Sequence, residues 1–162
     1  MKRAWTSADI LPSGGSLTLL GIATTTDGVI VEADGPGSAR CPSCRHHSVA
    51  RHSRYWRTIR DLPAHGKAVT LRVRVGRWRC HNARCARAIF ADRLGGVAAP
   101  RVHHTDRLGA IVHLVGHALG GRAGERLLAR LGMTIGADTI VGLVKCGAPV
   151  ATPDATLRVL HR

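Results

Sequence analysis

The stretch LRVRVGRWRCHNARC, residues Leu71–Cys85, decides how the middle of this chain folds. Apolar residues alternate with arginines as far as Arg79, and this period of two predicts a strand with one buried face rather than a helix. The alternation ends at two cysteines, Cys80 and Cys85. A sheet face that carries several arginines favours an anionic partner.

The positive charge is concentrated around this strand. The 162-residue chain has a formal net charge of +14, and between Arg40 and Arg93 there are 14 arginines and lysines against Asp61 and Asp92, a net charge of +12. Such clustering is typical of a protein that binds nucleic acid. The alternative is a basic surface in an arginine-rich proteome, because 21 of the 24 cationic residues are arginine.

Two pairs of strands are predicted before and within this basic region. The segments SLTLLGIATTT and VIVEA flank Asp27-Gly28, a dipeptide typical of a β-hairpin turn. A second pair, SRYWRTIRDL and AVTLRVRVGRWRC, flanks the turn sequence PAHGK. In the last strand the apolar residues at positions 69, 71, 73 and 75 share one face, and Trp78 falls on the other. We expect Gly76 to form a bulge there.

After the linker sequence GGVAAP the apolar period changes to that of helices. The first predicted helix spans about His104 to Leu119 with Thr105 as its cap, and Gly120-Gly121 ends it. RAGERLLARLG and ADTIVGLVKCG predict two further helices. Three helices favour a helix-turn-helix module. The alternative is a three-helix core without DNA contact, because the last helix has no Arg, Asn or Gln to read bases.

The most specific motif is the pair of cysteine knuckles, Cys41-Pro42-Ser43-Cys44 and Cys80 to Cys85. Two such knuckles can close a tetrahedron of thiolates around Zn²⁺ and leave no position open for a substrate. No apolar segment of a secretory signal follows MKRAWTSADI, so we expect a reducing cytoplasm, where cysteines favour metal over disulfides. A ligand from His46, His47 or His81 in place of one cysteine stays open.

Two longer segments resemble a known family. They are CPSCRHHSVARHSRYWRTIRDLPAHGKAVTLRVRVGRWRCHNARCARAIFADRL and GHALGGRAGERLLARLGMTIGADTI. Together they resemble the amino-terminal part of the ISL-three family of bacterial insertion-sequence transposases, from about Cys41 to Lys145, with Ser16 to Ala33 as a looser match. The resemblance implies a zinc-binding module and a helix-turn-helix that hold transposon ends before DNA cleavage and strand transfer.

Proteins of the ISL-three family also have a catalytic domain after this region. That long domain carries an Asp-Asp-Glu triad that binds two metal ions, and its first strand resembles LRVL at Leu157–Leu160. This chain stops at Arg162, before the position of the first catalytic Asp. We therefore expect a truncated transposase without catalytic residues or enzyme activity, because two-metal chemistry needs those carboxylates.

The sequence thus predicts an α+β fold, with a small antiparallel zinc-ribbon-like module followed by a three-helix helix-turn-helix module. The expected boundaries are 1–39 for the hairpin, 40–94 for the zinc module, 95–102 for the linker, 103–147 for the helices and 148–162 for the tail. The predicted ligands of one structural Zn²⁺ are Cys41, Cys44, Cys80 and Cys85. The predicted DNA-contacting residues are Arg54, Arg57, Arg60, Arg72, Arg74, Arg77, Arg79, Arg130 and Lys145.

The predicted function is to bind DNA at transposon ends, in the cytoplasm and away from membranes, with a full-length transposase relative as a further partner that the fragment could inhibit. Three alternatives stay open. One is an RNA-binding zinc ribbon in which Tyr55, Trp56 and Trp78 stack on bases. The second is a remnant without partners, and the third is an enzyme completed by another chain.

Overall fold

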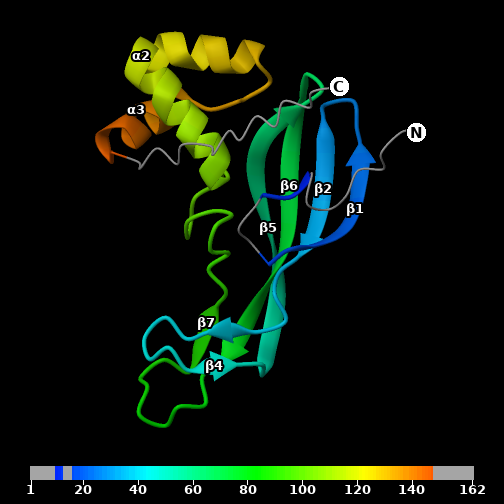
Figure 1. Cartoon of the computed structure of the whole chain (residues 1–162), viewed down its shortest axis with the longest axis vertical. Helices are drawn as coiled ribbons and strands as arrows, with labels where there is room; N and C mark the ends of the chain where they lie inside the picture. The colour runs from blue at the N-terminus through cyan, green and yellow to red at the C-terminus, as the bar shows by residue number, and fades with distance from the viewer. Residues whose placement is uncertain (1–9, 13–15, 148–162) are drawn as a thin grey trace, which may run out of the picture.

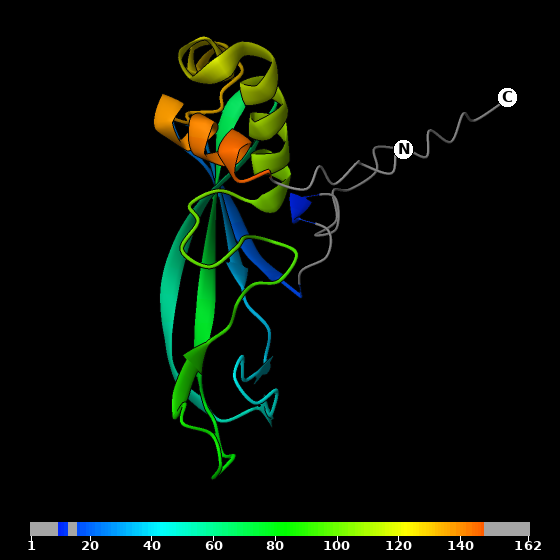
Figure 2. The ribbon, with the colours of Figure 1, turned by 90° about the vertical axis from the view of Figure 1, so that its left-hand side faces the viewer.

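The computed structural model describes residues 10–12 and 16–147. In this part of the chain a long twisted sheet joins two different ends, as Figure 1 and the perpendicular view in Figure 2 show. We call residues 105–146 the helical end. We call the short strands and loops of residues 39–50 and 78–91 the knuckle end, because they include both cysteine knuckles.

The large sheet has five strands, in the order β1-β2-β6-β5 with β7 paired to β6. Their bounds are β1 Thr18–Thr24, β2 Val29–Asp34, β5 Arg51–Ala64, β6 Lys67–Arg79 and β7 Ile89–Ala91. The predicted β1–β2 hairpin is confirmed, but β2 then runs parallel to β6. The sheet is therefore mixed, and the prediction of a small antiparallel module is wrong, although the α+β class is correct.

The alternation of apolar residues and arginines in the sequence corresponds to the two faces of β6. Its apolar residues at 69, 71, 73 and 75 are buried on what we call the inner face of the sheet, together with Val31 from β2 and Ile59 from β5. The tight β5–β6 turn uses the left-handed backbone of His65 and Gly66, with φ of 51° and 73°. The linker covers the inner face with Leu94, Val97 and Ala98, which belong to the same core.

Trp78 lies on the opposite face from Val75 and is fully buried at the knuckle end. Gly76 is needed beneath its indole, because a Cβ at this position would lie 2.8 Å from the ring. The predicted bulge is nevertheless not in β6. The register breaks on β5 between Arg51 and Ser53, which leaves His52 as the extra residue opposite Trp78 and Arg77.

The knuckle end holds a second, two-stranded sheet. It consists of β3, Ala39–Arg40, paired antiparallel with β4, His47–Ser48, on either side of the first knuckle. Its core is small and consists of Ala39, Cys41, Trp78 and Phe90, with the other three knuckle cysteines packed against it. So little apolar surface needs a further source of stability.

The described residues of the helical end form two helices, α2 at Asp106–Arg130 and α3 at Ala137–Lys145. The prediction of a three-helix helix-turn-helix module is therefore wrong. The first two predicted helices are one element, which bends at Gly120, where φ is 72° and ψ is −174°. The backbone of Gly120 is non-helical, so α2 consists of two helical segments that meet at a sharp kink there (Figure 1).

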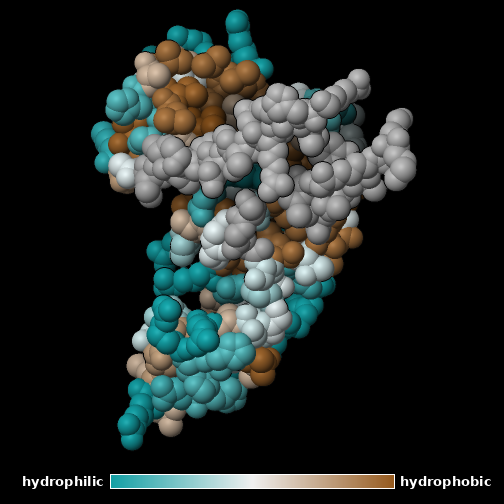
Figure 3. All heavy atoms as spheres, viewed as in Figure 1, coloured by the Kyte–Doolittle hydropathy of each residue, from teal (hydrophilic) through white to brown (hydrophobic). Residues whose placement is uncertain are grey.

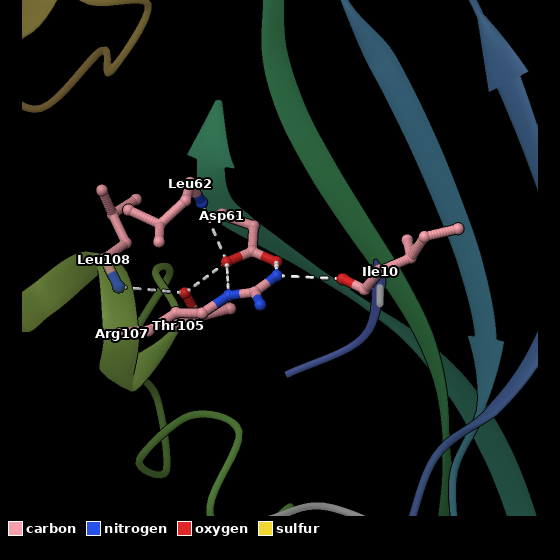
Figure 4. A network of polar contacts seen from close by, with 6 residues as sticks. All are labelled: Ile10, Asp61, Leu62, Thr105, Arg107 and Leu108. Atoms are coloured by element: carbon pink, nitrogen blue, oxygen red, sulfur yellow. Dashed lines mark hydrogen bonds and ion pairs between the residues drawn. The ribbon is translucent and has the colours of Figure 1, made fainter. Parts of the chain in front are cut away.

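A buried carboxylate joins α2 to the sheet. Asp61 at the end of β5 accepts hydrogen bonds from Thr105 Oγ1 at 2.7 Å and Arg107 Nε at 2.8 Å, and from its neighbour Leu62 N at 2.8 Å (Figure 4). Thr105 is also the N-cap of α2, as predicted. Because its charge is paired and its oxygens are hydrogen-bonded, Asp61 can be 96% buried without a large desolvation cost.

Some predictions fall outside this description. The tail 148–162, with the expected strand at Leu157–Leu160, lies outside the described residues. Within residues 10–12 and 16–147, neither helix combines the length and the apolar character needed to cross a membrane.

Candidate metal centre and basic surface

The two knuckles bring four sulfur atoms together. The Sγ atoms of Cys41, Cys44, Cys80 and Cys85 all lie within 4.8 Å of one another. Cys41 Sγ is 3.8 Å from Cys85 Sγ, and Cys44 Sγ is 3.6 Å from Cys80 Sγ. None of the four cysteines forms a disulfide.

These separations fit a tetrahedral zinc site. Four thiolates at the usual Zn–S distance of about 2.3 Å are separated from one another by about 3.8 Å along each tetrahedral edge. The two measured separations, 3.8 and 3.6 Å, are close to this value. A disulfide would need about 2.05 Å. The site therefore suits a metal that binds four sulfurs, and Zn²⁺ prefers this donor set.

Backbone hydrogen bonds shape both knuckles. In the first, Cys41 N donates to His46 O at 2.8 Å and Arg45 N donates to Cys41 O at 2.9 Å, with Arg45 at a φ of 62°. In the wider second knuckle, Cys85 N donates to Asn82 O at 2.9 Å. The second knuckle is two residues longer than a C-x-x-C pair, and the turn that begins at Asn82 accommodates these two residues.

Four thiols packed this closely cannot ionise equally, because neighbouring thiolates repel. Burial raises the pKa of Cys41, but hydrogen bonds from the N–H groups of Cys44 and Ser43 outweigh it and lower that pKa to about 6. The N–H of Asn82 lowers the pKa of Cys80, but burial and the neighbouring sulfurs outweigh it and raise that pKa to about 12. Bound Zn²⁺ would remove this conflict, because a divalent cation stabilises every thiolate.

The histidines proposed as alternative ligands lie outside the sulfur cluster. Among the described residues the metal-binding group consists of the four cysteines alone, and His46, His47 and His81 are exposed. His47 Nε2 instead lies 2.9 Å from Ser38 Oγ. Four sulfur ligands complete the coordination of Zn²⁺, so the site is structural.

Comparison with known families agrees with this geometry. Residues 37–85 match the family described as zinc-finger of transposase IS204/IS1001/IS1096/IS1165. This segment begins just before the first knuckle and ends at the last knuckle cysteine, Cys85. No curated protein and no solved structure matches the chain. The chain thus carries a transposase-type zinc finger, and the four cysteines bind structural zinc.

The arginines of β6 that the sequence presents as a basic face are partly neutralised. On the outer face of the sheet, opposite the inner core, Arg72 Nη1 donates to Glu32 Oε1 at 2.8 Å and Arg74 Nη2 to Asp34 Oδ2 at 2.6 Å. The hydrogen bonds from Arg74 hold the pKa of Asp34 below its usual range. Both guanidinium groups also lie near the ring of Trp56, at 5.0 and 5.9 Å.

Two further arginines that were predicted to contact DNA form hydrogen bonds within the protein. Arg57 Nη2 donates to the carbonyl groups of Ala99 and Val102, and thereby holds the linker against β5. Arg60 Nη1 donates to Thr134 O, between α2 and α3. These side chains use part of their donor capacity within the protein.

The other five predicted contact residues are exposed and accept or donate no side-chain hydrogen bond within the described part of the chain. They are Arg54, Arg77, Arg79, Arg130 and Lys145. Arg77 lies over the ring of Tyr55 at 5.1 Å. Arg54, Arg77 and Arg79 belong to the long strands near the knuckle end, whereas Arg130 and Lys145 end α2 and α3.

The proposed stacking residues differ in accessibility. Tyr55 and Trp56 are 37% and 43% exposed, so both can be reached by a ligand. Trp78 is fully buried, and Arg51 covers its ring at 4.9 Å, so its predicted role as a stacking residue is wrong.

Sequence reasoning missed three arginines that share a cavity. Arg87 comes from the second knuckle loop, Arg93 from the segment just after β7 and Arg101 from the end of the linker, and they line the same hollow as Arg57 and Tyr55. The only signal for them was the overall excess of arginine, because no local pattern indicates that three separate loops meet.

Proposed function

We propose that this chain is a transposase-related DNA-binding protein that holds phosphates on a basic surface fixed by structural zinc. The match of residues 37–85 to a transposase zinc finger carries the proposal, because it links the four-cysteine site to proteins that act on DNA. The net charge of +12 between Arg40 and Arg93 supports it independently.

Within that surface, the arginines without acidic partners are the expected phosphate contacts. Arg77 and Arg79 project from the end of β6 beside the knuckles, on the side of Val75, whereas Arg72 and Arg74 lie on the outer face and are paired with Glu32 and Asp34. A phosphate must compete with a carboxylate for each of the latter two. We therefore assign the larger electrostatic contribution to DNA binding to Arg77 and Arg79, which have no acidic partner.

The binding is expected to depend weakly on sequence. Helix α3, Ala137–Lys145, contains no Arg, Asn or Gln, the residue types that form bidentate contacts with bases. Contacts with phosphates fix position but do not read sequence. Transposon ends are the proposed natural target, and a full-length transposase relative would compete for them.

A salt titration tests this function. Fluorescence anisotropy with a labelled duplex should give log K falling linearly with log salt, by about 0.9 per phosphate contact. Replacing Arg77 and Arg79 together with Ala should flatten this slope by about 1.8. Replacing Arg72 and Arg74, the matched pair with the same change of charge, should flatten it less.

Two results would count against the proposal. A wild-type protein with bound zinc that shows no affinity for duplex at low salt would refute DNA binding. An end-containing duplex and an unrelated duplex of equal length should compete within about tenfold of each other, since phosphate contacts dominate. A much larger preference would show base readout that α3 does not explain.

A further inference from the structure

A cavity of about 420 Å³ lies where the knuckle end meets the linker. Its walls include Tyr55 and Arg57 from β5, Arg87 from the second knuckle loop, Arg93 just after β7 and Arg101 from the linker. Its volume falls within the range of about 300–1,000 Å³ that is usual for small-molecule sites. Four arginines around one hollow of this size favour an anionic ligand.

Most of the hydrogen-bonding capacity of these arginines is unused. The side chains of Arg93 and Arg101 are exposed and form no ion pair or hydrogen bond within residues 10–12 and 16–147. Arg87 Nε donates to Ser43 Oγ at 3.0 Å, and its two terminal nitrogens remain available. Guanidinium groups donate in a planar fork that matches the oxygens of a phosphate.

Arg101 is held in a backbone conformation that costs free energy. Its φ is 65°, in the left-handed region that non-glycine residues rarely adopt. Such residues cluster at binding and catalytic sites, because the surrounding structure maintains the strain. Here the strained residue is also one of the two cavity arginines without a partner, which favours a role in binding.

The cavity also has an aromatic wall and a carboxyl group. Tyr55 is 37% exposed, and Arg77 lies over its ring. The acid among the lining residues is Asp92, whose Oδ2 is buried without a hydrogen-bond partner. Burial raises the pKa of Asp92, and even when it is ionised this one carboxyl faces four arginines, so the cavity keeps a positive charge.

The aromatic wall distinguishes between forms of DNA. Bases within a duplex stack on one another, so only an unpaired base can lie against a side chain such as Tyr55. An arginine-lined hollow beside an exposed aromatic ring is the combination that single-strand sites use, with the charge following the backbone and the ring stacking on a base.

We propose that this cavity binds one unpaired nucleotide of single-stranded DNA, with its phosphate at Arg87, Arg93 and Arg101 and its base beside Tyr55. The proposal rests on the proposed DNA-binding function and names the form of DNA that this cavity takes. It assigns to the linker a part in binding as well as in connecting the sheet to the helices.

The test compares labelled dodecathymidine with a 12-base-pair duplex on the full zinc-bound chain. Replacing Arg93 with Ala and Arg101 with Asn, a residue that tolerates a positive φ, should weaken dodecathymidine binding by at least about tenfold and flatten its salt slope by about 1.4. Arg126→Ala is the control for a lost charge, because Arg126 is an exposed residue of α2 that does not line the cavity.

Two further variants separate recognition from folding. Tyr55→Leu should weaken dodecathymidine binding roughly 5- to 100-fold and leave duplex binding unchanged, whereas Tyr55→Phe should keep both affinities. Arg101→Gly should raise the melting temperature by roughly 2–4 °C, since glycine adopts a positive φ freely, and should still weaken single-strand binding. A purely structural role for Arg101 would not give these opposite effects.

The outcomes distinguish the cavity site from DNA binding by the basic surface. Duplex binding that persists while the Arg93, Arg101 and Tyr55 variants bind dodecathymidine like the wild type would overturn the cavity site alone. A wild-type chain that binds neither probe at low salt would overturn both proposals. Tighter binding to dodecauridine than to dodecathymidine would show that the cavity is an RNA site and overturn the assignment to DNA.

Discussion

At the helical end six apolar side chains are buried between α2, α3 and the loop that joins them, and the buried carboxylate of Asp61 pairs with the partly exposed Arg107. At the knuckle end the buried hydrophobic residues are Ala39, Cys41, Trp78 and Phe90, beside four sulfurs within 4.8 Å of one another. Figure 3 shows the same contrast on the surface, with hydrophobic residues over the helices and hydrophilic ones over the knuckles. The two ends share one sheet but differ in what stabilises them.

Removal of zinc should produce the largest difference in stability between the two ends. A chelator under reducing conditions should abolish hydrogen-exchange protection in residues 39–50 and 78–91 and leave protection in α2 and α3 largely intact. Structural zinc in finger peptides contributes about 10–16 kcal/mol at pH 7, more than the small knuckle core can replace. Mass spectrometry of exchanged peptides measures this, and loss of protection throughout α2 would show instead that the chain is one cooperative unit.

Asp61→Asn should be the most damaging single change at the helical end. It leaves the buried Thr105 and the partly exposed Arg107 without their charged acceptor, which costs about 1.5–3 kcal/mol of unfolding free energy. Urea denaturation monitored by circular dichroism measures this. Zinc content should not change, because the network lies at the opposite end of the sheet from the knuckles (Figure 1).

The matched control for Asp61 is Asp34→Asn. Asp34 also accepts from an arginine, but both side chains of that pair are partly exposed, so its loss should cost no more than about 1 kcal/mol. Equal losses for the two variants would show that burial of Asp61 does not set its contribution.

Substitutions at the contact between the two helices should change stability less, and more locally, than Asp61→Asn. A Cβ at Gly116 would lie 2.5 Å from Ile140 Cγ2, so Gly116→Ala should force α2 and α3 apart and cost about 1–3 kcal/mol. In α3 a Cβ at Gly142 would meet nothing within 4 Å, and Gly142→Ala should stabilise the helix by up to about 1 kcal/mol. Thermal unfolding should give opposite signs for these two substitutions, and the same sign would contradict this packing.

The smallest expected effect concerns pH and the sheet between the two ends. The hydrogen bonds from Arg74 hold the pKa of Asp34 below 3.8 in the folded protein. A lowered carboxyl pKa adds stability that is fully present above the unfolded value and is lost only as pH falls through the folded value. The difference in unfolding free energy between wild type and Asp34→Asn should thus stay constant from pH 8 to about pH 5.5. A difference that shrinks across this window would contradict the assigned shift.

Local patterns were enough to predict much of the sheet and the metal site. The period of two located β6 and its buried face, Asp27-Gly28 located the first hairpin, and the two knuckles identified the zinc ligands. In each case the decisive residues are close in sequence or belong to a motif whose spacing is fixed by metal geometry. Such features can be read without knowing the fold.

The errors concern partners that are distant in sequence. Nothing near Arg72 or Arg74 reveals that β2 runs parallel to β6 and places Glu32 and Asp34 beside them. The cavity arginines were missed for the same reason, since three loops form that site. The break predicted at Gly120-Gly121 is present as a kink within α2, but no local signal shows that the two segments form one element that packs on α3 at Gly116 and Gly121.

The parallel pairing of β2 with β6 also has a consequence for synthesis on the ribosome. Val29 pairs with Val69, 40 residues later, so the first hairpin must wait about 2–8 s at usual translation rates for its neighbour to be made. The last knuckle cysteine, Cys85, is added only after β6 is complete. Closure of the zinc site therefore follows synthesis of all the long strands of the sheet and can precede synthesis of α2 and α3.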